Sequence, residues 1–231
     1  IKKHCFVSPA EESLLKTPAR PIVLLTLKED KMSPLTNMGS LYCGAFLPYT
    51  PLQKLLVKEC GELIMTSANI SNRPIIKDDE EIHSLKSPLI SGILYNKRRI
   101  LRSVDDSVVK VINNKPQMIR RSRGYVPDSH SLAIKVDKPI LSVGADLKST
   151  FCLVKDNEAI VSQYFGDLAE ALVFDEYTRE YNDLKKLLDI EPKKVVCDMH
   201  PLYRSVKFAE SLNLPIDYVQ HHHAHIAAVM A

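Results

Sequence analysis

The chain has 231 residues, of which 45% are hydrophobic and 26% charged, the composition of a soluble globular protein with room for one large or two ordinary domains. No apolar run is long enough to span a membrane and no signal-peptide pattern is present, so we expect a cytoplasmic protein without a membrane partner. The net charge of +3 is too small to indicate nucleic-acid binding by itself, and five scattered cysteines argue against a disulfide framework or a zinc ribbon.

The first half of the chain predicts several strands and two helices. Thr50 and Pro51 provide an N-cap followed by proline at the first helical position, and Gly61 ends the helix that they begin. A short acidic helix follows at residues 78–85. Apolar and β-branched runs predict strands at 21–27, 41–47, 63–66, 100–112 and 117–121, the last two as a hairpin.

Two groups of polar side chains in this half are candidates for binding anions. Ser67, Asn69 and Ser71 crowd into a turn after a predicted strand, where hydroxyl and amide groups suit phosphate or carboxylate oxygens. The same residues are equally typical of a plain turn. Arg120 and Arg121 flank the hairpin and can clamp anionic oxygens, although a solvated face is the more common place for such charges.

The second half predicts an α/β layer structure. Periodicity is lost between residues 124 and 138, so we predict a domain at 1–127, a linker at 128–138 and a second domain at 139–231. The pattern of the second domain is β-β-β-α-β-α-β-α. Its predicted strands and helices are 139–143, 150–155, 158–163, 168–189, 194–197, 202–212, 216–219 and a helix from 221.

The turn after the first of these strands is a weak candidate for a phosphate-binding loop. It carries Gly144, Asp146 and Lys148 together with hydroxyl side chains, but it lacks a specific motif.

A metal site is predicted at the histidine cluster 221–225. In a helix, His221 and His225 point the same way and can offer two imidazoles to zinc or iron(II), and His222 with His225 is the alternative pair. The nearby candidates for further ligands are Asp198 and His200. An expression tag or a pH-sensitive interface are the other interpretations, although a strand leading directly into the cluster is unlike a tag.

With these motifs in place, the chain resembles the hydrogenase-maturation carbamoyltransferases of the HypF family over essentially its whole length. The resemblance implies an α/β fold: a twisted YrdC-like domain, followed by part of a TsaD-like domain of the actin-like ATPase superfamily. The matching segments are 20–22, 47–52, 66–71, 104–109, 119–127, 143–148, 166–168, 198–201 and 219–225.

The resemblance implies an activity that uses ATP, Mg²⁺ and carbamoyl phosphate. The first domain would form carbamoyl adenylate, and the second would pass the carbamoyl group to the C-terminal cysteine of the protein HypE. Nucleotide and substrate would be held by Ser67, Asn69, Ser71, Ser107, Arg120, Arg121, Gly144, Asp146 and Lys148. His221 and His225 would hold the metal, Fe or Zn, and no residue is singled out as catalytic.

The family's acylphosphatase domain, zinc-finger region, first part of the YrdC-like domain and later TsaD-like segments are missing from the sequence. We therefore expect the chain alone to be inactive. The alternative enzyme is a tRNA threonylcarbamoylation enzyme, although its two halves are normally separate chains. The non-enzyme alternative is an RNA-binding module built on the basic cluster at 97–123, which lacks interleaved aromatic residues.

Overall fold

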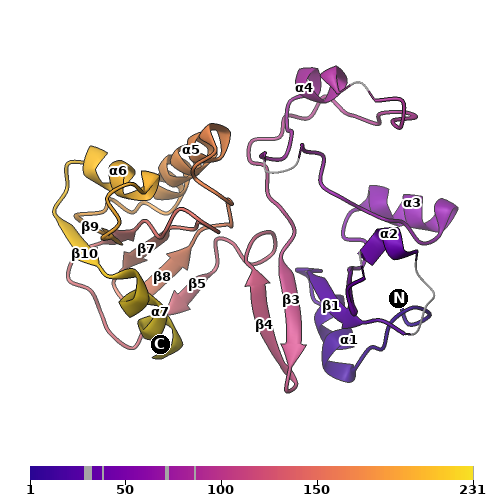
Figure 1. Ribbon diagram of the computed structural model, residues 1–231, viewed down its shortest axis with the longest axis horizontal. Coiled ribbons are helices and arrows are strands. Elements are labelled where there is room, and N and C mark those ends of the chain that lie inside the picture. The colour runs from indigo at the N-terminus through magenta and orange to yellow at the C-terminus, as the bar shows by residue number, and fades with distance from the viewer. Residues whose placement is uncertain (29–32, 38, 71–72, 86, 231) are drawn as a thin grey trace. The chain divides into compact units, whose positions relative to one another are not determined.

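The chain divides into two compact units in the computed structural model, which describes residues 1–28, 33–37, 39–70, 73–85 and 87–230. The first unit comprises Ile1–Ser67 and Asp105–Tyr125, and the second comprises Ala68–Val104 and Val126–Ala231. Both units contain a sheet with helices, so the expected α/β fold class is confirmed (Figure 1).

The first unit is built on a four-stranded sheet of order β2-β1-β3-β4. Its strands are β1 (Ile22–Thr26), β2 (Tyr42–Ala45), β3 (Val108–Ile112) and β4 (Lys115–Arg120). Strand β1 pairs antiparallel with β2 and parallel with β3, which joins two segments that are far apart in the sequence. The helices are α1 (Pro9–Lys16), α2 (Pro34–Asn37) and α3 (Pro51–Cys60). Leu15 of α1 packs in the core with Val23 and Leu25 of β1.

Helix α3 begins and ends as the sequence predicts. Thr50 Oγ1 accepts a hydrogen bond from the Gln53 backbone at 3.2 Å, and the Gln53 side chain accepts one from the Thr50 backbone at 3.2 Å. Gly61 follows the helix with a positive φ of 77°, a conformation that glycine adopts without a side-chain clash.

Two strand predictions in this unit were wrong in whole or in part. Residues 63–66 form no strand, and the side chains of Leu63 and Ile64 are exposed, because an apolar run becomes a strand only where a neighbouring strand accepts its hydrogen bonds. Strand β3 starts at Val108 rather than at residue 100, because its pairing with β1 starts only where Val108 meets Ile22.

The second unit is built on a six-stranded sheet of order β10-β9-β6-β7-β8-β5. Its strands are β5 (Ser129–Ser131), β6 (Ile140–Ser142), β7 (Cys152–Lys155), β8 (Glu158–Val161), β9 (Lys194–Asp198) and β10 (Ile216–Val219). Strands β6, β9 and β10 are parallel, whereas β5 to β8 pair antiparallel. From β6 onward the element order is the predicted one, and β5 is an additional strand within 128–138.

Helices α5 (Ala171–Leu187) and α6 (Arg204–Ser211) lie together over one face of this sheet (Figure 1). Tyr177 of α5 is fully buried, and its ring meets that of Phe208 of α6 edge to face, with centroids 5.5 Å apart. The Tyr177 hydroxyl donates a hydrogen bond to the Val143 carbonyl at 2.8 Å, which fixes the end of β6. Helix α7 (His221–Met230) follows β10, and α4 (Asp79–Ser84) lies in the irregular segment 68–104. Throughout the described ranges, no helix has both the length and the apolar character that crossing a membrane would need.

Candidate functional site

Ser107 lies at the base of the β3–β4 hairpin and is fully buried. Its hydroxyl donates to the Arg123 carbonyl at 3.0 Å and accepts a hydrogen bond from the Ser122 backbone at 2.8 Å. Both contacts are within the protein, so this hydroxyl holds the start of β3 to the segment that follows β4.

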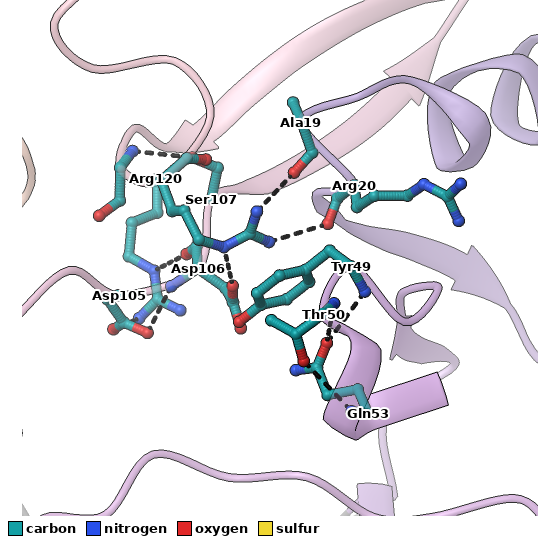
Figure 2. Close-up of polar contacts among 11 residues, drawn as sticks. Ala19, Arg20, Tyr49, Thr50, Gln53, Asp105, Asp106, Ser107 and Arg120 are labelled. Carbon is teal, nitrogen blue, oxygen red and sulfur yellow. Dashed lines mark hydrogen bonds and ion pairs between the residues drawn. The ribbon is translucent and has the colours of Figure 1, made fainter. Parts of the chain in front are cut away.

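Arg120, one of the two arginines predicted to clamp anions, is held by the acidic loop before β3. Its Nε donates to the Asp106 carbonyl at 3.0 Å, and a terminal nitrogen pairs with the Asp105 carboxylate at 2.5 Å (Figure 2). The side chains of Arg120 and Asp105 are 27% and 30% exposed, so solvent reaches the pair. A guanidinium carries five N–H donors, and an anion arriving here would meet a group already held in one orientation.

The other predicted anion-binding residues lie in different surroundings. Arg121 donates from a terminal nitrogen to the Tyr125 carbonyl at 2.6 Å. Asn69, in the second unit, donates from Nδ2 to the carbonyls of Ile70 and Arg73 at 3.1 Å each, which is the pattern of a closed polar turn. Ser67 is exposed at the end of the first unit's first segment, and Ser71 lies outside the described residues.

The three residues of the loop after β6 that were predicted to bind phosphate, Gly144, Asp146 and Lys148, lie in different environments. A Cβ on Gly144, whose φ is 69°, would lie 2.4 Å from the Thr150 carbonyl oxygen, so the loop closes only with glycine there. The buried Asp146 carboxylate accepts hydrogen bonds from the Arg204 and Ser205 backbones at 2.8 and 3.0 Å. Asp146 therefore caps the start of α6, whereas the side chain of Lys148 is exposed.

The two predicted metal-binding histidines come together at the carboxyl ends of β9 and β10. Asp198 ends β9, and His221 begins α7 two residues after Val219, which pairs with Asp198. The Asp198 carboxylate is 2.7 Å from Nδ1 of His221, and Nε2 of His221 is 3.1 Å from Nε2 of His225. Such strand ends are where ligands bind in open α/β sheets.

The 3.1 Å between the two Nε2 atoms is a hydrogen-bond distance, so Asp198, His221 and His225 form one hydrogen-bonded chain. With the Nδ1 proton directed to Asp198, the lone pair of His221 is on Nε2 and faces Nε2 of His225, which is the arrangement that a carboxylate-supported ligand needs. His200, the other candidate, accepts a hydrogen bond at Nδ1 from the Leu202 backbone at 3.3 Å, and its ring stacks on Tyr203. Among the residues that the structure describes, no group of three or more His, Cys, Asp or Glu side chains could hold a metal ion.

Arg123 is a residue of this region to which sequence reasoning gave no individual role. Its guanidinium pairs with Asp106 at 2.8 Å and lies 3.5 Å from the ring centre of Tyr49. The sequence does hint at such contacts, because an acidic pair at 105–106 lies close to four basic residues at 115–123. Which acidic residue contacts which basic residue is visible only in the fold.

Two family models match the chain in sequence order. Residues 1–122 match the Sua5/YciO/YrdC family, described as telomere recombination, and residues 135–231 match the HypF Kae1-like domain. The two matches in one chain favour HypF over the tRNA-modifying enzymes, and Arg102, Arg120, Arg121 and Arg123 of the basic cluster all contact groups within the protein.

Curated relatives and solved structures agree with these matches. The carbamoyltransferase HypF of Rhizobium leguminosarum bv. viciae is 40% identical, over 96% of this chain and 30% of the relative. That of Synechocystis sp. is 37% identical, over 100% of this chain and 30% of the relative. The crystal structure of full-length HypF in the phosphate- and nucleotide-bound form has a TM-score of 0.93 at 41% identity, covering 100% of this chain and 37% of that one. HypF of T. kodakarensis has a TM-score of 0.90 at 32% identity, covering 98% of this chain and 30% of that one.

The chain thus spans roughly a third of the length of the proteins that it matches. Within that span it joins a Sua5/YciO/YrdC match to a HypF Kae1-like match, and its whole described structure follows that of HypF. The chain therefore belongs to the HypF family.

Proposed function

We propose that the chain forms part of a cytoplasmic carbamoyltransferase of hydrogenase maturation and contributes to two of its sites. At the first, carbamate released from carbamoyl phosphate would attack the α-phosphorus of ATP, forming carbamoyl adenylate as pyrophosphate leaves. At the second, the carbamoyl group would pass to the thiol of the C-terminal cysteine of HypE, releasing AMP. The names of the relatives support carbamoyl transfer, and a solved HypF structure is in a phosphate- and nucleotide-bound form. The observation that carries the proposal is the histidine pair backed by Asp198.

At the first site, Arg120 would bind phosphate oxygens of ATP, which carries Mg²⁺ and develops negative charge as pyrophosphate departs. Its guanidinium is fixed by Asp105 and Asp106, so little conformational entropy is lost when the phosphate binds. Ser67, which belongs to the same unit as Arg120, would add a hydroxyl donor, and Ser107 would hold the loop in place.

At the second site, His221 and His225 would hold Fe or Zn, which when bound polarises a carbonyl for attack by a thiol. Asp198 would keep His221 in the tautomer whose Nε2 can ligate. The exposed Lys148 would provide a cation for a phosphate oxygen at the loop after β6.

The first test is titration of the 231-residue chain with Zn²⁺ or Fe²⁺ by calorimetry. We expect the double variant His221→Ala/His225→Ala to lose binding and Asp198→Asn to weaken it by about tenfold or more, since supporting carboxylates contribute that much to affinity. His130→Ala, which changes an exposed histidine in β5, is the control and should bind as the wild type does. Wild-type affinity in the double variant would contradict the metal site.

The second test separates the two half-reactions in a HypF-type protein that carries these residues. The double histidine variant should lose carbamoyl transfer to HypE but retain carbamoyl phosphate-dependent exchange of pyrophosphate into ATP. The isolated chain should show no such exchange. Retention of both reactions by the variant would mean that the histidine pair is structural.

A further inference from the structure

Arg123 uses all three guanidinium nitrogens within the protein. Nε donates to the Asp106 carboxylate at 2.8 Å, and the two terminal nitrogens donate to the carbonyls of Ala19 and Arg20 at 2.8 and 3.1 Å. The guanidinium also lies 3.5 Å from the ring centre of Tyr49. This side chain is therefore committed to the protein, unlike that of Arg120, whose contacts involve Nε and one terminal nitrogen.

The backbone next to Arg123 also packs closely against the turn at Ala19 and Arg20. A Cβ added to Gly124, whose φ is 82°, would lie 2.8 Å from the Cα of Ala19, so the two chain segments cross in close contact. Arg20 has a φ of 43°, a left-handed conformation that is uncommon for a residue other than glycine. The carbonyls of this unusual turn are the groups to which Arg123 donates, so the guanidinium stabilises the crossing.

The loop that precedes β3 connects Arg123 to Arg120. The Asp106 carboxylate accepts a hydrogen bond from Arg123. The Asp106 carbonyl accepts one from Arg120 (Figure 2). The Arg123 backbone N–H donates to the Asp105 carbonyl at 3.1 Å, and Asp105 in turn holds the guanidinium of Arg120. The two arginines therefore share one short acidic loop, and their side chains are similarly exposed, 23% for Arg123 and 27% for Arg120.

We propose that Arg123 is a positioning residue for the nucleotide reaction: it fixes the loop at 105–107 so that Arg120 is held ready for phosphate. The proposal rests on the nucleotide-binding role proposed above for Arg120. In this proposal Arg123 acts through Arg120 and not on the substrate, because each of its three nitrogens already donates to a group of the protein and its guanidinium lies against the Tyr49 ring. Lysine cannot replace it, since one ammonium cannot serve a carboxylate, two carbonyls and a ring at once.

The test uses the 231-residue chain and compares Arg123→Gln and Arg123→Lys with Lys115→Gln. This control makes the same charge change as Arg123→Gln, at an exposed position of β4. Two quantities are measured: the NMR signal of the Arg120 Nε–H group without ligand, and the dissociation constant for Mg²⁺·ATP. We expect both Arg123 variants to broaden or shift the Arg120 signal and to weaken ATP binding about tenfold, the size of a charged hydrogen-bond effect. Lys115→Gln should change neither.

A double-mutant cycle distinguishes positioning from general support of the fold. If Arg123 acts through Arg120, Arg120→Ala/Arg123→Gln binds ATP no more weakly than Arg120→Ala alone. Additive losses, or an Arg120 signal unchanged in both Arg123 variants, would overturn the proposal. If Arg123→Gln does not fold, Arg123→Lys provides the same comparison. A wild-type chain that binds no ATP would refute the nucleotide role of Arg120, and the Arg120 signal would still decide whether Arg123 holds it in place.

Discussion

Asp146 lies 58 residues before the helix whose N–H groups it accepts, so its carboxylate ties the loop after β6 to the start of α6. The first N–H groups of a helix have no partner inside the helix, and a negative charge there is also favoured by the helix dipole. Two hydrogen bonds to a buried carboxylate are among the stronger polar contacts in a protein.

We expect Asp146→Ala to lower the free energy of unfolding by about 2 kcal/mol, because a buried and a partly buried backbone N–H group lose a charged acceptor. Denaturant unfolding followed by circular dichroism measures the loss. Asp167→Ala is the control, since its carboxylate accepts from the Ala169 backbone in an exposed turn. Equal losses of unfolding free energy in both variants would show that the buried cap stabilises the protein no more than the exposed turn contact does.

The residues that meet within one helix were easier to predict from the sequence than contacts between distant parts of the chain. Local spacing suggested that His221 and His225 would meet, because a helix brings residues four apart together, and their rings do meet, edge to face. The capping role of Asp146 and the carbonyl contacts of Arg123 were not predictable, because their partners are 58 to 104 residues away and only the fold brings them near.

Helix α5 carries an acidic stripe at helical spacing that binds the segment 68–104. Glu176, Glu180 and Asp183 recur every three or four residues, and Glu176 and Glu180 are buried. Arg102 lies 3.4 Å from Glu180 and 3.6 Å from Asp183, and Ser103 donates to Glu176 at 3.3 Å. Arg102, one arginine of the basic cluster at 97–123, therefore contacts protein carboxylates.

Burial raises the pKa of Glu180 above its usual value, and the nearby Arg102 only partly opposes this. A raised pKa means that the folded state binds a proton more tightly than the unfolded state does. Stability therefore falls as pH rises from the unfolded pKa of Glu180 through its folded pKa.

We expect the stability of the wild type to increase, relative to Glu180→Gln, as pH is lowered from neutral through that interval, because only the wild type gains from the proton. Urea unfolding midpoints at several pH values measure the difference. Asp175→Asn, at an exposed position of α5, should run parallel to the wild type. A constant difference between wild type and Glu180→Gln would show that burial does not control this carboxyl.

The helices and strands that the sequence predicted correctly are those whose start and end are specified by their own residues. The helix from Thr50 to Gly61 carries its start and stop in its own residues, and both were confirmed. The strand predicted at the apolar run 63–66 was wrong, because a strand also needs a neighbouring strand to pair with, and the run itself does not provide one. Strand β5 was missed because its three residues, Ser129–Ser131, lie in a polar stretch with Pro127 and have no apolar alternation.

The two units contain cores of very different size. The core of the second unit joins β6, β7, β9, α5 and α6 around Tyr177, whereas that of the first unit is centred on Val23 and Leu25 of β1. Since burial of apolar side chains is the main stabilising contribution to folding, the second unit should open less readily.

We expect hydrogen exchange of backbone amides to be slower in β9 and α5 than in β1 and β3, by about tenfold or more if the cores differ by more than 1.4 kcal/mol. Mass spectrometry of peptides from the exchanging chain measures this. Leu184→Ala, which creates a cavity in the larger core, should accelerate exchange in α5 and leave β1 unchanged. Identical exchange throughout would show that the units open together.

Strand β5 has a consequence for any attempt to shorten the chain. Its residues Ser129–Ser131 cover the outer edge of β8, and they lie between the end of the first family match at 122 and the start of the second at 135. A protein cut at 135 would keep β8 but present its edge as an open template for pairing with other molecules. With β5 in place the edge of the sheet is a shorter and more polar strand than β8, which is a poorer template for pairing, so a soluble second domain should be sought by starting before residue 129.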